Sequence, residues 1–138
     1  MTDSRAFVER FRATAAVLSG TGRERSPTEL VDAWGTFVDL SEDGYGDNIY
    51  EYENDLAVRG LIEKLLRSDE LRGDPGMSWF AEHVQAIDER FRRLLRPERL
   101  PVADDVPWWR AHPPRYAGEE LAADFRQQYS VEVAVNDG

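Results

Sequence analysis

Residues 34–66 read WGTFVDLSEDGYGDNIYEYENDLAVRGLIEKLL, and this stretch decides the fold because it joins the end of one helix, an acidic turn and the most apolar helix of the chain. Side chains at steps of three and four share one face of that helix: Tyr45, Ile49, Tyr52 and Leu56. Beyond Val58 the apolar positions shift to the opposite side. The central helix is therefore predicted to be covered on both sides or broken near Gly60, where an interior glycine is unfavourable.

Helical patterns also occur on both sides of this stretch. Apolar residues follow helical spacing over residues 5–19, 75–96 and 119–129. Another helix should begin at Ser26, which forms a capping box with Glu29. The central helix is predicted over residues 48–71, with Asp47 as its cap and residues 39–48 as the preceding loop. Residues 130–135 alternate in polarity, which indicates a short strand or an extended tail. The predicted fold class is all-α: a single-domain bundle of about five helices.

Size and composition agree with one globular domain. The chain has 138 residues, of which 41% are hydrophobic, enough to bury a continuous core. It contains no cysteine, which excludes disulfides, thiolate metal sites and cysteine nucleophiles. Charged residues interrupt the first twenty positions, so we expect no signal peptide and no membrane span there. A cytoplasmic location fits these features.

The charge of the chain is acidic and unevenly distributed. The net charge is −10, which disfavours binding to nucleic acid or anionic membranes and favours basic partners. Residues 26–58 contain nine acidic residues and no lysine or arginine, whereas residues 90–99 contain five arginines. The two regions either compensate each other within the fold or remain solvated faces. If these arginines neutralise the acidic residues internally, no free acidic surface is left for a basic partner.

The acidic turn resembles part of a calcium-binding EF-hand loop. Six residues fit positions 1, 3, 5, 6, 7 and 9 of that pattern: Asp39, Ser41, Asp43, Gly44, Tyr45 and Asp47. The pattern then fails, because its twelfth position needs a glutamate and holds Tyr50, while Glu51 comes one residue late. We therefore predict a capped helix-helix turn without metal or cofactor, and calcium binding is a minor alternative.

Catalytic motifs are absent from the sequence. The chain has no GxxxxGK[ST], GxGxxG or GxSxG pattern, and neither His83 nor His112 has the spacing of a zinc or di-iron ligand pair. The carboxylates of Glu51, Glu53 and Asp55 alternate along a helix and so point in different directions. No acid-base pair is predicted, and a non-catalytic protein is favoured over an enzyme.

Residues 97–118, which we call the proline-rich loop, contain five prolines, which exclude a regular helix. Long loops that carry large aromatic residues are usually pinned to the body of the protein and are often functional. The second function class is therefore an enzyme or small-molecule-binding protein with a pocket under this loop. Its candidate lining residues are Trp108, Trp109, Arg115 and Tyr116.

Several features of the middle of the chain resemble small bacterial immunity proteins, which are encoded beside toxins and block them by binding. These features are the WxxF of Trp34 and Phe37, the GY turn at Gly44 and the EYxNDL of residues 51–56, in a small, helical and acidic chain. The resemblance implies a protein without catalysis whose acidic face occupies the basic active site of a toxin. It assigns no role to any single residue.

The function predicted from the sequence is binding to a basic protein partner through the acidic stretch. Carboxylates would steer and pair with the partner, and exposed tyrosines would supply an apolar centre. The candidate partner-binding residues are Asp39, Glu42, Asp43, Tyr45, Asp47, Tyr50 and Glu51.

Overall fold

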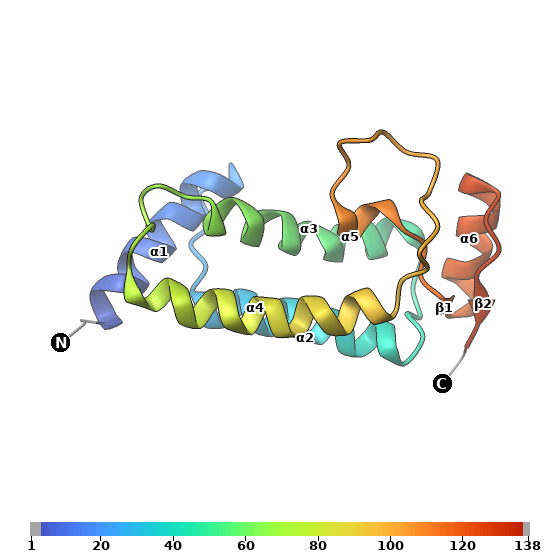
Figure 1. The fold of residues 1–138 in the computed structure, drawn as a ribbon, viewed down its shortest axis with the longest axis horizontal. Helices are drawn as coiled ribbons and strands as arrows, with labels where there is room; N and C mark the ends of the chain where they lie inside the picture. Colours follow the sequence, from blue (N-terminus) through green and yellow to red (C-terminus); the bar gives the residue numbers. More distant parts are fainter. Residues whose placement is uncertain (1–3, 137–138) are drawn as a thin grey trace. The chain divides into compact units, whose positions relative to one another are not determined.

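The computed structural model describes residues 4–136, which contain six helices and one two-stranded sheet (Figure 1). The helices are α1 (Ser4–Ser19), α2 (Pro27–Glu42), α3 (Ile49–Leu66), α4 (Pro75–Arg93), α5 (Trp108–Ala111) and α6 (Glu119–Tyr129). The strands are β1 (Tyr116–Ala117) and β2 (Ala134–Val135). The predicted all-α class is confirmed. Within the described residues, no helix combines the length and the apolar composition needed to cross a bilayer.

The chain divides into two compact units. The first unit comprises Met1–Gly35 and Ala57–Ile87, and the second comprises Thr36–Leu56 and Asp88–Gly138. The chain passes from one unit to the other inside α2, α3 and α4. The prediction of a single domain stays a prediction.

Aromatic packing between α1 and α4 marks the core of the first unit. Phe11 is fully buried, and its ring centroid lies 5.8 Å from that of Phe7 and 4.9 Å from that of Phe80. A Cβ atom added at Gly76 would lie 2.5 Å from the ring of Phe7. The start of α4 can therefore approach α1 this closely only because Gly76 has no side chain.

The predicted start of α2 is confirmed, whereas its end lies later than expected. The amide of Glu29 donates a hydrogen bond of 3.1 Å to Ser26 Oγ, as the capping box requires. α2 continues to Glu42, so the prediction that residues 39–48 are all loop is wrong. Ser41 is buried one turn beyond the buried Phe37, and continued packing of this face extends the helix.

Side-chain caps fix the start of α3. Asn48, and not the predicted Asp47, is the cap: Asn48 Oδ1 accepts a 2.9 Å hydrogen bond from the amide of Glu51. A carboxylate oxygen of Asp124, in α6, accepts a 3.0 Å hydrogen bond from the amide of Ile49. These acceptors satisfy two of the free N–H groups at the start of α3 and tie α6 to it.

α3 is unbroken at Gly60 and ends at Leu66 rather than at residue 71. Its buried residues follow each other at steps of three or four: Ile49, Tyr52, Leu56, Arg59, Ile62 and Leu65. The predicted change of side beyond Val58 is therefore wrong, because the buried Arg59 continues the stripe. Apolar periodicity does not count an arginine as a buried position. Arg59 Nη1 lies 3.0 Å from Glu63 Oε1, one turn further along the helix.

Backbone hydrogen bonds close the proline-rich loop at its base. The amide of Arg96 donates to the carbonyl of Pro113 at 2.9 Å, and the amide of Leu100 donates to that of Ala111 at 2.8 Å. The expectation that this segment lacks helix is corrected by α5, a single turn that begins directly after Pro107. The segment is thus a closed, pinned loop rather than a free connection.

Residues 130–135 were predicted to be a short strand or an extended tail, and their last two residues form the strand β2, whose partner lies in the same chain. β2 runs parallel to β1, with Tyr116 opposite Ala134 and Ala117 opposite Val135. Ser130 adopts φ 57°, and its amide reaches the carbonyls of Phe125 and Arg126, which ends α6 and turns the chain back. The predicted bounds of α6 are confirmed.

Candidate functional site

The second unit carries almost all of the net charge. It contains seventeen acidic residues and eight arginines, a net charge of −9, whereas the first unit contains ten acidic and nine basic residues. A net charge of this size creates a negative potential around this unit, which favours cations over anions.

Arg90 neutralises two of the predicted partner-binding carboxylates. Its Nη2 atom donates hydrogen bonds of 2.5 Å to Asp39 Oδ1 and to Glu42 Oε1. Both acids lie in the last turn of α2, where the helix dipole disfavours negative charge and no basic residue of α2 compensates. Hydrogen bonds from Glu42 and Asp39 raise the pKa of Arg90. Asp39 and Glu42 are therefore neutralised within the fold, and neither is kept in the candidate partner-binding surface.

Replacing Arg90 by alanine is expected to lower the free energy of unfolding by about 1 kcal/mol, since the two acids would then face the carbonyl end of α2 alone. Urea unfolding at low salt measures the loss, and salt of about 1 M should shrink it by screening. Arg93→Ala, at an exposed position of the same helix, is the control. Equal losses in both variants would show that the ion pairs contribute nothing.

Tyr45 is buried, which corrects the prediction that it is an exposed anchor. Only 4% of the residue is accessible, and its hydroxyl donates a 2.6 Å hydrogen bond to Asp55. Burial, and then the hydrogen bond to Asp55, raises the pKa of the Tyr45 hydroxyl. The ring packs against Phe37 and Tyr52, with centroids 5.6 and 5.2 Å apart. Tyr45 thus belongs to the core of the second unit.

Three exposed carboxylates of the predicted acidic stretch lie close to two others from a segment far away in sequence. The amide of Gly118 donates a 3.0 Å hydrogen bond to the carbonyl of Tyr45, which brings the start of α6 against the 44–46 turn. A shallow hollow of about 490 Å3 lies there, lined in part by Gly44, Gly46, Glu119 and Glu120. Five exposed acids on these two segments form what we call the acidic rim: Asp43, Asp47, Glu51, Glu119 and Glu120.

The acidic rim retains three of the predicted residues and adds two that the sequence did not indicate. Glu119 and Glu120 are ordinary first-turn acids of a helix, so the sequence pattern does not show that they lie near the 44–46 turn, where the hydrogen bond at Gly118 places them. None of the five acids forms an ion pair with another residue in the range 4–136. Tyr50, predicted as an exposed aromatic anchor, is 76% exposed and precedes Glu51.

No group of three or more histidine, aspartate or glutamate side chains in the described part of the chain has the geometry of a metal site. The first ligand positions of the suspected EF-hand pattern, Asp39 and Ser41, lie within α2 rather than in a loop. The calcium-loop arrangement therefore does not form.

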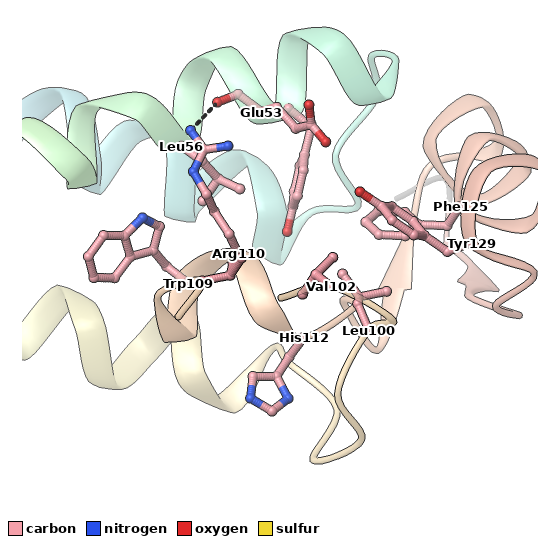
Figure 2. Close-up of a pocket in the computed structure, with 11 residues that line it drawn as sticks. Glu53, Leu56, Leu100, Val102, Trp109, Arg110, His112, Phe125 and Tyr129 are labelled. Carbon is pink, nitrogen blue, oxygen red and sulfur yellow. Dashed lines mark hydrogen bonds between the residues drawn. The ribbon is translucent and has the colours of Figure 1, made fainter. Parts of the chain in front are cut away.

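A pocket of about 200 Å3 lies within the second unit (Figure 2). α3 contributes Tyr52, Glu53 and Leu56, and α6 contributes Phe125 and Tyr129. The proline-rich loop contributes the remaining lining residues: Leu100, Val102, Val106, Trp109, Arg110 and His112. Figure 2 shows Arg110 reaching from α5 to the backbone carbonyl of Glu53, to which its Nη2 atom donates a 3.2 Å hydrogen bond.

Of the four predicted pocket residues, only Trp109 lines this pocket. The guanidinium of Arg92 lies 4.0 Å above the ring of Trp108. Arg115 donates through Nε to the carbonyl of Arg93 at 3.1 Å, and the Tyr116 hydroxyl donates to the carbonyl of Glu42 at 2.6 Å. These three side chains hold the base of the loop to the ends of α2 and α4.

In comparisons with protein-family models, curated proteins and solved structures, nothing matches this chain.

Proposed function

We propose that the chain is a non-catalytic protein-binding module whose acidic rim engages a basic protein partner. The observation that carries the proposal is the position of the rim: five exposed carboxylates, free of ion pairs within the described chain, gather in the unit with a net charge of −9. Such a surface accelerates association with a basic protein and rejects acidic competitors. The exposed Tyr50 beside Glu51 supplies the aromatic contact that interface centres favour.

The partner class is a further part of this proposal. The resemblance to immunity proteins suggests a bacterial toxin with a basic active site, blocked by the acidic rim. Asp39 and Glu42 already form ion pairs with Arg90. The proposed contact with the toxin therefore centres on the other predicted acids, residues 43, 47 and 51, and extends to the first turn of α6.

A charge-reversal experiment tests the rim directly. The probe is the basic C-terminal domain of a toxin-like protein encoded beside this chain, and calorimetry measures its binding. Asp43→Lys combined with Glu51→Lys should weaken binding about 10- to 100-fold and flatten its salt dependence. Asp104→Lys with Asp105→Lys changes the net charge equally at exposed positions of the proline-rich loop, and should change affinity less than about threefold.

Similar weakening by both double variants would mean that only the net charge matters. Unchanged binding by the Asp43 and Glu51 variant would exclude the rim as the contact surface. Small-molecule binding, the other function class, is favoured by a separate observation, the pocket of the second unit.

A further inference from the structure

We infer that the pocket of the second unit binds a small, neutral aromatic molecule with one hydrogen-bonding group, of the phenol or indole class. This site is independent of the acidic rim. The inference rests on the volume of the pocket, its aromatic walls and Tyr52, a lining residue whose buried hydroxyl has no hydrogen-bond partner among the described residues.

The volume of the pocket limits the size of the ligand. An apolar cavity of about 150 Å3 accommodates benzene, so the 200 Å3 of this pocket accommodates one substituted ring or a fused pair of small rings. The walls are largely apolar: Leu56 from α3, Leu100 and Val102 from the loop, and Phe125 from α6. Aromatic side chains on such walls favour offset or edge-to-face contact with a planar ligand.

The hydroxyl of Tyr52 provides the polar contact. Tyr52 is 4% exposed, and its hydroxyl is buried without a hydrogen-bond partner among the described residues. Leaving a buried hydroxyl unsatisfied costs about 1–3 kcal/mol, which a ligand with a hydroxyl or N–H group would recover. Burial raises the pKa of Tyr52, so this hydroxyl keeps its proton and can both donate and accept.

The charges at the pocket favour a neutral ligand. Arg110 and Glu53 both line it, and the Arg110 guanidinium is already bound to the carbonyl of Glu53. Burial and the negative charge of Glu53 raise the pKa of Tyr129, which keeps that hydroxyl neutral as well. The net charge of −9 in this unit further opposes an anion such as benzoate.

The pocket wall is held in place before any ligand binds. Leu100 is fixed by the hydrogen bond from its amide to Ala111, and the ring of His112 lies 3.0 Å from the carbonyl of Glu98 through Nδ1. Val102 follows in a tight turn, with its amide donating to the carbonyl of Leu100 at 2.8 Å. Such preorganisation reduces the entropy lost on binding.

Calorimetric titration with phenol, indole, benzene and benzoate tests the inference. Phenol and indole should bind saturably to one site, with dissociation constants of about 0.1–1 mM for ligands of this size. Tyr52→Phe should weaken phenol binding about 5- to 10-fold and leave benzene binding within about twofold. Tyr50→Phe removes an exposed hydroxyl from the same helix and should change neither. Val102→Trp, at a half-buried position, should fill the pocket and abolish binding while circular dichroism stays unchanged.

Three results would overturn the inference. These are the absence of saturable phenol and indole binding, phenol binding to Tyr52→Phe as tight as to the original chain, and benzoate binding tighter than that of phenol. None of them bears on the acidic rim, whose variants lie outside the pocket lining.

Discussion

Replacing Phe37 by alanine is expected to lower the free energy of unfolding by about 3–5 kcal/mol. Phe37 is 3% exposed, and its ring centroid lies 5.6 Å from Tyr45, 5.4 Å from Tyr52 and 5.5 Å from Phe91. Truncation removes the transfer free energy of the ring, leaves a cavity and breaks several tilted aromatic contacts at once. The three partner rings belong to α3, α4 and the 44–46 turn, so the loss affects the whole core of the second unit.

Urea unfolding followed by circular dichroism measures this effect. Tyr50→Ala removes a ring of similar size that is 76% exposed, and should change stability by less than about 0.5 kcal/mol. Phe37→Leu retains most of the volume and should lose clearly less than the alanine variant. A loss below about 1 kcal/mol for Phe37→Ala would contradict the central place of this ring.

Local sequence signals predicted the helices well. The capping box at Ser26 and the bounds of α6 are as predicted, because each depends on residues within one turn of the boundary. The errors arose where distant contacts decide. Residues 39–48 have the composition of a turn, yet Asp39 and Glu42 lie in α2. Their ion pairs with Arg90, about fifty residues away, and the burial of Ser41 stabilise the helix there. The buried Arg59 similarly concealed the continuous stripe on α3, since a charged residue is normally counted as exposed.

The candidate sites were less predictable than the fold because they combine residues from separate segments. The sequence indicated the acidity of residues 43–51 but not the approach of Glu119 and Glu120, which follows from hydrogen bonds between distant segments at Gly118 and Asp124. The large aromatic residues of the loop predicted a pocket beneath it, but they did not predict which residues line that pocket. In the structure, the aliphatic Leu100 and Val102 line it together with Trp109, whereas Trp108 pairs with Arg92.

Replacing Gly44 by alanine is expected to lower the free energy of unfolding by about 2–3 kcal/mol. Gly44 has φ +90°, a conformation that side chains rarely adopt, and a Cβ atom there would lie 2.0 Å from the carbonyl oxygen of Asn136. That oxygen belongs to backbone, so relief requires moving the tail. The amide of Asn136 donates to the carbonyl of Ala117 at 2.8 Å, next to the paired strands β1 and β2. The strain therefore extends from the acidic turn to the sheet.

Gly46→Ala is the matched control, two residues further along the same turn. Nothing lies within 4 Å of a Cβ atom at Gly46, and its φ is outside the left-handed range, so alanine should be neutral or stabilise by up to about 1 kcal/mol. Hydrogen exchange should show loss of protection at the Asn136 amide in Gly44→Ala but not in Gly46→Ala. Both substitutions remove the same backbone freedom from the unfolded chain and differ only in what the new methyl group contacts. Equal stability of the two variants would therefore mean that the tail does not pack on Gly44.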